Sequence, residues 1–276
     1  MSFFTSLSGL KAAQTDLNVI SNNVANTNST GFKKSRALFG DLFTASPTQA
    51  TSSIAGQGVR LNGITQQFTQ GTMQPTDKTL DLAIAGDGFF AVKSQPPSDQ
   101  VTYSRHGAFT VNDDHEVVDT IGSKAQLLPV DANGVVTSTN AADLYDFVVP
   151  EFDPLDPAAL LTNISINNEG VVSATFSNGN QTNLGAMAMA SFPALEGLRP
   201  MGDAHWQSTG DSGLPEFNQA GSGALGQVRS GYLELANVDI TEELVSLISA
   251  QRNFQANAQA IETSSTLTQT IMNLQI

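Results

Sequence analysis

One stretch of the sequence has the residue order of a turn that carries a nucleophilic serine. Residues 210–213 read Gly-Asp-Ser-Gly. That chemistry needs a histidine base on the serine and a carboxylate that orients the histidine. His106, His115 and His205 stand in no supporting motif, and Leu214 follows where a further glycine would be expected. We therefore predict a glycine-rich turn here and no nucleophile.

A second stretch has the glycine spacing of a dinucleotide-binding turn. Glycines at 221, 223 and 226 match GxGxxG. The turn that binds a pyrophosphate must follow a strand and open a helix. Here a polar stretch precedes the glycines and the strand-like QVRSGYLEL follows them. Nucleotide binding is therefore not expected.

A third stretch is rich in oxygen ligands. Residues 112–116 (NDDHE) lie close to Asp119, and calcium takes six to eight oxygen atoms. The cluster lacks the residue order and the glycine of an EF-hand, so we expect a solvated hairpin turn. Trp206 and His205 are expected in the core and in a turn. We predict no enzyme, no cofactor and no metal site, with an enzyme or binding module on a β-domain as the remote alternative.

The composition excludes several classes of partner. Twelve basic residues stand against 26 acidic ones in 276, giving a net charge of -14. Nucleic-acid affinity rests on clustered Lys and Arg, and anionic membranes also attract basic segments. No stretch reaches the roughly 18 apolar residues of a membrane span, and the N-terminus lacks the pattern of a secretory signal. We expect no nucleic-acid partner and no membrane insertion, and the absence of cysteine excludes disulfides.

The two ends of the chain predict long helices. Apolar residues recur three or four positions apart, first up to Val24 and again from Ile240 onward. Each seam is narrow and needs a partner helix. We expect the ends to pair with each other and to pack against further copies, although two surface helices of one globular domain are the alternative. Asp239 with Glu242 predicts a capping box. The predicted subunit-packing residues are Leu7, Leu10, Leu17, Ile20, Val24, Leu244, Leu247, Phe254, Ile261, Leu267, Ile271 and Leu274.

The middle of the chain predicts strands. Apolar and polar residues alternate at 59–71, 80–92 and 162–179, and Asn-Gly turns lie at 133–134 and 178–179. Residues 44–58 predict a loop, and residues 150–160, with three prolines, predict irregular structure. The predicted fold class is a mainly β central domain plus an α-helical coiled-coil domain formed by the paired N- and C-terminal helices. The predicted domains are the N-terminal helix of the inner coiled-coil domain (1–40), a linker or extended hairpin (41–70), an outer β-domain (71–229) and the C-terminal helix of the inner domain (230–276).

Four blocks of sequence, in order, resemble those of bacterial flagellar rod and hook proteins. They lie at 22–33, 80–90, 104–110 and 237–257, so the resemblance covers most of the chain. Any single block would be weak, whereas four in the same order are specific. The signature residues are Asn22, Asn23, Ala25, Asn26, Gly31, Phe32, Lys33, Gly88, Phe89, Phe90, Asn237, Asp239, Gln251 and Arg252.

Within this family the sequence is most similar to hook subunits. The similarity lies in residues 31–43, 63–68 and 185–192 and in Asn273-Leu274. The short linker after Lys33 also favours a hook subunit, because an insertion there would favour a rod subunit. The chain is nevertheless short for a hook subunit, which commonly carries an extra outer β-domain, and the turn at 114–116 lacks the usual glycine. A rod subunit is therefore the alternative.

The resemblance implies a structural role. Members of the family polymerise into a helical tube that transmits torque from rod to filament and through which later subunits are exported. The implied partners are further copies of the chain, the rod protein, the hook cap and hook-filament junction proteins, and the flagellar type III export apparatus, which takes unfolded chains. The implied location is the hook and basal body, outside the cell. The resemblance implies no cofactor.

Overall fold

The computed structural model describes residues 2–43, 56–95, 99–154 and 156–274. The chain forms two compact units. Met1–Thr27, Lys34–Gln67 and Val238–Ile276 form the first, here called the paired-helix unit. Asn28–Lys33 and Phe68–Asn237 form the second, here called the β-unit. Two packed terminal helices and a central antiparallel sheet confirm the predicted fold class. The domain boundaries given above stay predictions.

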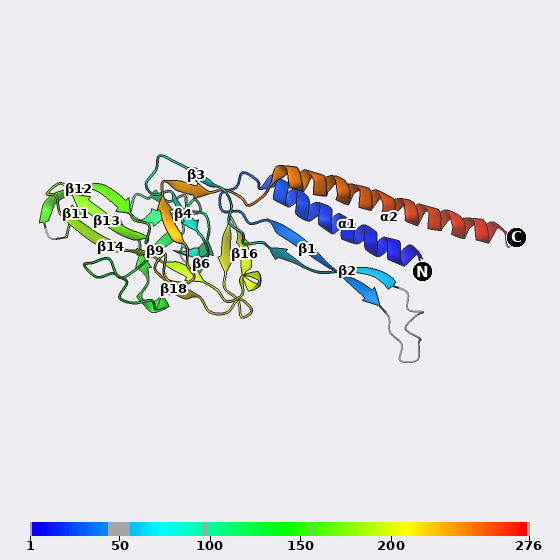
Figure 1. Cartoon of the computed structure of the whole chain (residues 1–276), viewed down its shortest axis with the longest axis horizontal. Helices are drawn as coiled ribbons and strands as arrows, with labels where there is room; N and C mark the ends of the chain where they lie inside the picture. The colour runs from blue at the N-terminus through cyan, green and yellow to red at the C-terminus, as the bar shows by residue number, and fades with distance from the viewer. Residues whose placement is uncertain (1, 44–55, 96–98, 155, 275–276) are drawn as a thin grey trace. The chain divides into compact units, whose positions relative to one another are not determined.

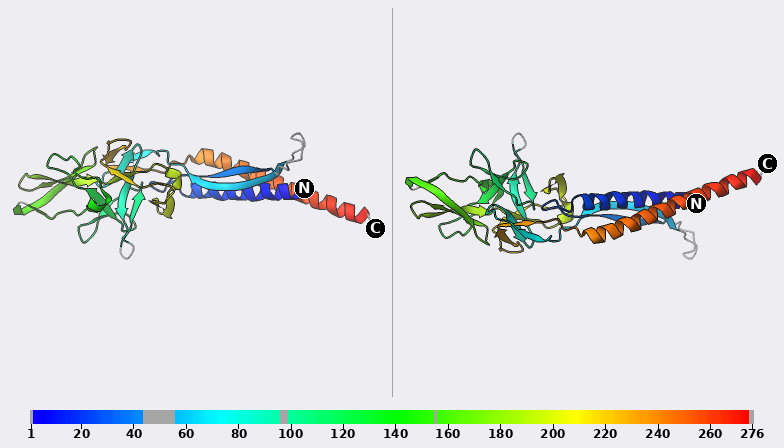
Figure 2. Two further views of the ribbon diagram at one scale, coloured as in Figure 1. Left: turned by 90° about the horizontal axis from the view of Figure 1, so that it is seen from below. Right: turned by 90° about the horizontal axis from the view of Figure 1, so that it is seen from above.

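The paired-helix unit is built on two antiparallel helices. Helix α1 (Ser2–Ala25) lies beside α2 (Ile240–Leu274) (Figure 1). Gly9 fits against Asn257, whose Oδ1 lies only 2.6 Å from where a Cβ on Gly9 would stand. Because α2 has 35 residues and α1 has 24, the C-terminal part of α2 continues past the start of α1 (Figure 2). Neither helix is long and apolar enough to cross a membrane.

A two-stranded hairpin completes the paired-helix unit. Strand β1 (Ser35–Phe43) pairs antiparallel with β2 (Gly56–Gln66), and both lie along α1 (Figure 2). A two-stranded hairpin is marginal alone, and the Val59 N–H donating to Ser8 Oγ at 3.2 Å helps to fasten it to α1. Residues 56–58 of the predicted loop belong to β2. Residues 44–55 of that loop lie outside the described residues.

The β-unit contains one sheet of 14 strands and two smaller strand pairs among its described residues. The main path of the large sheet runs β11-β12-β13-β14-β9-β5-β6-β17-β16, while β19 pairs with β4 and β20 with β3. Short 3-10 helices lie at Ala141–Asp143 and Leu195–Gly197. The strands are β3 (Met73–Pro75), β4 (Leu82–Ala85), β5 (Phe89–Lys93), β6 (Val101–Ser104), β7 (Thr110–Val111), β8 (Val117–Val118), β9 (Lys124–Leu128), β10 (Tyr145–Asp146), β11 (Phe152–Asp153), β12 (Asp156–Ile166), β13 (Val171–Phe176), β14 (Gln181–Met187), β15 (Met189–Ser191), β16 (Arg199–Gly202), β17 (His205–Gln207), β18 (Glu216–Asn218), β19 (Gln227–Ser230) and β20 (Tyr232–Glu234).

The core of the β-unit is divided between the two faces of β5. Successive side chains of a strand point to opposite faces, so Phe90 and Phe89 enter different clusters. Phe90 stacks edge to face on Phe109, with 5.7 Å between ring centroids. Phe89 makes the same kind of contact with Trp206, at 5.5 Å. The pair of phenylalanines therefore joins two apolar clusters across one strand.

The prediction for residues 150–160 was wrong in part. Strand β11 and the first residues of β12 lie in this segment, despite its prolines. Pro157 lies in the part of β12 that pairs with β11, before the pairing with β13 begins at Leu161. Proline is tolerated in strands where its missing N–H faces no neighbour. The pairing of β12 with β11 is therefore compatible with a proline at position 157.

Candidate functional site

The serine at the centre of the Gly-Asp-Ser-Gly stretch is a turn residue. Ser212 is fully buried. Its Oγ accepts the N–H of Thr209 at 2.9 Å and donates to the carbonyl oxygen of Thr209 at 3.0 Å. A buried hydroxyl that is engaged on both sides cannot reach an external substrate, so the stretch is structural.

The GxGxxG stretch is a turn between strand segments. Gly226 donates its N–H to the carbonyl oxygen of Asp87 at 2.8 Å. A Cβ at Gly226 would lie 2.3 Å from the carbonyl oxygen of Ala85, so only glycine fits. Strand β19 follows directly instead of a helix. The geometry that would bind a pyrophosphate is therefore not formed.

The oxygen-rich cluster at 112–116 is one of four turns built in the same way. In each turn a side-chain Oδ1 accepts the backbone N–H groups two and four residues further on, at 2.8 to 3.0 Å. The acceptor oxygens are therefore committed to the backbone, and the described residues hold no group of three or more His, Cys, Asp or Glu arranged for a metal ion. The four acceptors are Asn112, Asp119, Asp131 and Asn167.

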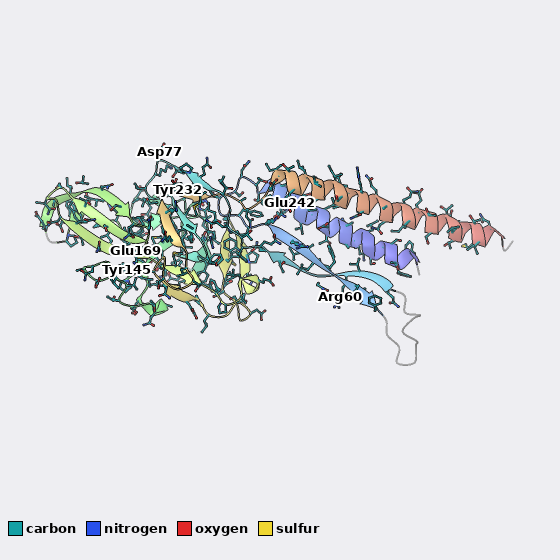
Figure 3. The ribbon with its side chains drawn as sticks, viewed as in Figure 1. Arg60, Asp77, Tyr145, Glu169, Tyr232 and Glu242 are labelled. Carbon is teal, nitrogen blue, oxygen red and sulfur yellow. The ribbon has the colours of Figure 1, made fainter. Side chains whose placement is uncertain are left out.

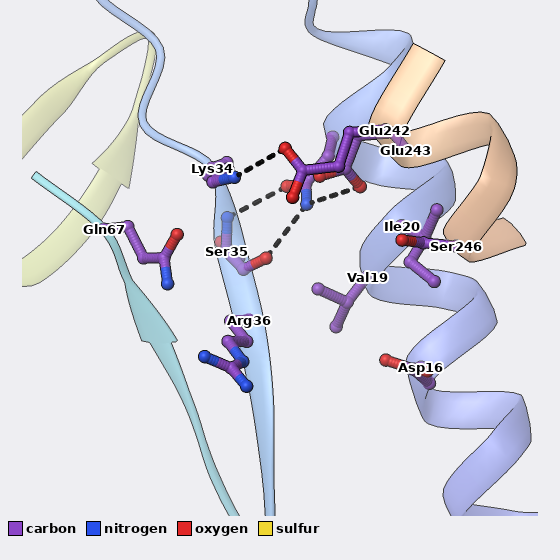
Figure 4. Close-up of a pocket in the computed structure, with 11 residues that line it drawn as sticks. Asp16, Val19, Ile20, Lys34, Ser35, Arg36, Gln67, Glu242, Glu243 and Ser246 are labelled. Carbon is purple, nitrogen blue, oxygen red and sulfur yellow. Dashed lines mark hydrogen bonds and ion pairs between the residues drawn. The ribbon is translucent and has the colours of Figure 1, made fainter. Parts of the chain in front are cut away.

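A cavity of about 420 Å³ lies inside the paired-helix unit, between α1, the start of α2 and the hairpin (Figure 4). The signature residue Asn23 lines it and is buried. Its Nδ2 donates to the carbonyl oxygen of Ser35 at 2.9 Å, and its Oδ1 accepts the N–H of Ser35 at 2.9 Å. Nδ2 also lies 3.3 Å from Oε2 of the buried Glu243. An amide is both donor and acceptor, so one side chain fastens α1 to β1 and to α2.

The same cavity carries charges of both signs. Lys34 Nζ lies 3.6 Å from Glu242 Oε2 (Figure 4). Burial raises the pKa of Asp16 from its ordinary value, and the charge of Arg36 opposes that rise. The side chain of Glu242, at the start of α2 (Figure 3), is nevertheless 67% exposed. These groups order three elements, and they include no paired nucleophile and base.

The start of α2 corrects half of the predicted capping box. Asp239 Oδ1 accepts the N–H groups of Thr241 at 2.8 Å and of Glu242 at 3.1 Å, so the aspartate caps the helix. The predicted return contact of Glu242 was wrong. Its carboxylate lies beside Lys34 instead, because the lysine offers it a positive charge.

A second group of signature residues lies at the edge of the β-unit. Gly31 has a positive φ of 70°, and a Cβ there would lie 2.7 Å from the carbonyl carbon of Arg105. Lys33 Nζ forms an ion pair with Glu234 Oε1 at 2.7 Å, and Asn237 Nδ2 donates to the carbonyl oxygen of Thr69 at 3.1 Å. The backbone carbonyl of Phe32 accepts the N–H of Asn237. Gly88, with a φ of 122°, precedes the two core phenylalanines.

The blocks that resemble the family contain Lys33 and Arg105 but not Glu234, which pairs with both. Glu234 is a charged residue inside a strand-like segment, which is the signal that could have found it. The structure does not bring the remaining signature residues together. Asn22, Ala25, Gln251 and Arg252 are exposed on the helices, and Asn26 Nδ2 donates to the carbonyl oxygen of Asn22. Their roles stay predictions.

Comparison with known proteins places these residues in a family. Three family models match the chain: "Flagella basal body rod protein" at residues 4–33, "Flagellar hook protein FlgE/F/G D1 domain" at 83–174, and "Flagellar basal body rod FlgEFG protein C-terminal" at 229–274. The flagellar basal-body rod protein FlgG of Buchnera aphidicola is 32% identical over 285 residues, covering 99% of both chains. The chain belongs to the flagellar rod and hook protein family.

Two further relatives, from Bacillus and Salmonella, agree with this assignment. FlgG of Bacillus subtilis is 32% identical over 99% of this chain and 98% of its own. The flagellar hook protein FlgE of Salmonella typhimurium is 28% identical over 411 residues, covering 99% of this chain and all of the hook protein. A crystal structure of the Helicobacter pylori hook protein FlgE2 matches 73% of this chain and 43% of that one, with 13% identity and a TM-score of 0.24. This flagellar axial protein is thus a non-enzymatic structural subunit of the rod or hook, exported to the cell surface.

The paired-helix unit of this flagellar protein leaves much of its apolar surface uncovered. Of the predicted subunit-packing residues, Ile20 is buried, whereas Leu244 is 44% exposed and Leu267 and Ile271 are 60% exposed. Leu7, Leu10, Leu17, Val24, Leu247, Phe254 and Ile261 are half-buried, and the side chain of Leu274 lies outside the description. Further apolar residues of this unit that were not among the predicted packing residues are also exposed, including Phe4, Leu38, Phe43, Leu61, Ile64, Val245, Ile248 and Met272.

Proposed function

We propose that this chain is a hook subunit that polymerises with further copies of itself. The observation that carries polymerisation is the uncovered apolar surface of the paired-helix unit. Leu267 and Ile271 lie on the part of α2 that continues past α1. Burial of an apolar side chain of this size contributes about 1.5–3 kcal/mol, so several such residues supply association free energy. Contacts that do not close on themselves generate a helical filament.

The assignment to the hook rests on sequence segments that are similar to those of hook subunits. The segments 31–43 and 63–68, which contain parts of both hairpin strands, are similar to those of hook subunits. The end of the chain, Asn273-Leu274, supports the same assignment. In a hook the subunit would pass torque from the rod to the filament and line a channel for later subunits. Its partners would be the rod protein, the hook cap, the hook-filament junction proteins and the type III export apparatus.

A rod subunit is the second candidate, and chain length favours it. The alignments with the FlgG rod proteins of Buchnera and Bacillus extend over 285 positions, close to the 276 residues of this chain. The alignment with the Salmonella hook protein extends over 411 positions. That hook protein therefore carries a long segment with no counterpart here.

Immunogold electron microscopy of isolated flagella separates the two candidates. We would use an antibody against residues 71–225, within the β-unit, and preparations lacking the gene as the control. Gold along the short curved segment between basal body and filament is the result expected of a hook subunit. Gold confined to the straight segment within the envelope would identify a rod subunit. Gold on neither would contradict both candidates.

A further inference from the structure

A buried ion cluster lies at the edge of the β-unit. The carboxylate of Glu234, at the end of β20, has no exposed surface. Its Oε1 lies 2.7 Å from Lys33 Nζ and accepts the N–H of Gly71 at 2.8 Å. Its Oε2 accepts a hydrogen bond from Nη1 of Arg105 at 3.1 Å. The side chains of Lys33 and Arg105 are also buried, with 0% and 2% exposure.

The cluster holds two cations and one carboxylate. Lys33 Nζ also donates a hydrogen bond to the carbonyl oxygen of Thr69, at 2.8 Å. The guanidinium of Arg105 lies 5.3 Å from the ring centroid of Phe89, and its Nε has no partner. Burial lowers the pKa of Lys33, in keeping with a site short of negative charge. Among the described residues, Glu234 alone forms an ion pair with either cation.

The carboxylate of the cluster comes after both cations in the sequence. Glu234 follows Lys33 by 201 positions and Arg105 by 129. The backbone of the same segment also bonds to earlier parts of the chain. The carbonyl oxygen of Glu234 accepts the N–H of Gly31 at 2.8 Å, and β20 pairs with β3. A chain made from its N-terminus therefore contains both cations before it contains the group that neutralises them.

We propose that Glu234 is the closing group of the β-unit, so that a chain that does not yet present it stays open. A buried charge that loses its partner is strongly destabilising. Without the carboxylate, the ratio of folded to unfolded β-unit should fall by roughly 10²- to 10³-fold. Delayed closure suits a chain that is exported in an unfolded form. That use rests on the export part of the proposed function, whereas the closing role does not depend on it.

The first test compares two full-length variants by denaturant unfolding. The single Trp206 is buried in the β-unit and reports on its unfolding. Glu234→Gln keeps the size of the side chain but removes its charge, and we expect the loss given above. Glu216→Gln is the control, because Glu216 is exposed in β18 of the same unit, and it should unfold like the original chain. A Glu234→Gln ratio within threefold of the control would overturn the proposal.

The second test separates charge from packing. Lys33→Met removes one of the two cations. In that background, the fold-decrease that Glu234→Gln causes in the ratio of folded to unfolded β-unit should be at least ten times smaller than in the original chain. The coupling is measured from the same unfolding curves. Equal costs in both backgrounds would mean that the carboxylate does not act by neutralising Lys33, and this would overturn the proposal. Both outcomes are independent of where in the flagellum the protein lies.

Discussion

At the residue scale, side-chain oxygens of Asn and Asp accept hydrogen bonds from the backbone N–H groups of their own turns. The clearest case is the turn at 112–116, whose Asn112 Oδ1 accepts the N–H groups of Asp114 and Glu116. The fourth residue of each such turn has a positive φ. Three of the turns place Gly122, Gly134 or Gly170 there, and the fourth places His115, with a φ of 60°.

His115→Gly should stabilise the β-unit. A left-handed conformation costs a residue with a Cβ about 1–2 kcal/mol, and the entropic cost of glycine offsets part of that gain. We expect a net stabilisation of about 0.5–1 kcal/mol, measured by urea unfolding with Trp206 fluorescence. Gly134→Ala, which places a Cβ in the same conformation, should destabilise the unit. A variant of His115 that is less stable than the original chain would refute this account of the turn.

His106 predicts a pH dependence of the β-unit. Burial lowers its pKa from the ordinary 6.5, and the charges of Asp119, Asp203 and Asp81 oppose the shift while His205 adds to it. The unfolded chain therefore takes up this proton at a higher pH than the folded one. The stability that neutral His106 contributes is present above about pH 6.5 and is lost as the pH falls through and below that value.

His106→Gln should therefore lose less stability than the original chain between pH 7.5 and 5.5. The measurement is the urea midpoint across that range, followed by Trp206 fluorescence. His115→Gln serves as the control, because His115 is exposed, and it should keep the original pH profile. Identical profiles for His106→Gln and the original chain would show that His106 is not the titrating group.

At the element scale, the helices and the β-domain could be predicted from residue patterns, but their connections could not. Apolar spacing and the lack of Gly and Pro after Ile240 predict α2 well, and alternation predicts β5 and β13. The apolar spacing of the first helix runs up to Val24, and α1 ends at Ala25, with β1 beginning at Ser35. Gly31, with its positive φ, reverses the chain between them.

The contacts that order the candidate site join residues far apart in sequence. Asn23 meets Glu243 across 220 positions, and Lys33 meets Glu234 across 201. Periodicity identifies which face of a helix is apolar, but it carries no information on which polar residue faces which. The blocks that resemble the flagellar family contain Asn23, Glu243 and Lys33 but not Glu234. The sequence therefore marked both partners of the first contact without pairing them, and only one partner of the second.

Asn23→Ala should loosen the paired-helix unit. The variant removes both hydrogen bonds to Ser35 and leaves the backbone groups of this half-buried residue without these partners, which costs about 1–3 kcal/mol for each group that stays dry. We expect assembled polymer to dissociate at a lower temperature. Asn22→Ala is the matched control, because the Asn22 side chain is exposed on the next position of α1. Equal dissociation temperatures for the two variants would remove Asn23 from this role.

At the scale of the whole molecule, the two units present different surfaces. The core of the β-unit is closed by residues such as Phe89, Phe90 and Trp206, which have at most 2% exposure. The paired-helix unit exposes apolar side chains on both its helices and its hairpin. A monomer gains little from such residues in water, so they indicate surfaces that are covered in a polymer. The net charge of -14 opposes non-specific association of free subunits.

The most direct test of polymerisation through the helices is the subunit concentration at which purified protein begins to polymerise. Leu267→Ser with Ile271→Ser removes two apolar side chains that are each 60% exposed. Leu214→Ser is the control, because Leu214 is 85% exposed but belongs to the β-unit. Burying the exposed 60% of each side chain contributes about 1–2 kcal/mol, so we expect the double variant to need a concentration at least tenfold higher, with the control unchanged. A double variant that polymerises at the original concentration would contradict assembly through this helix face.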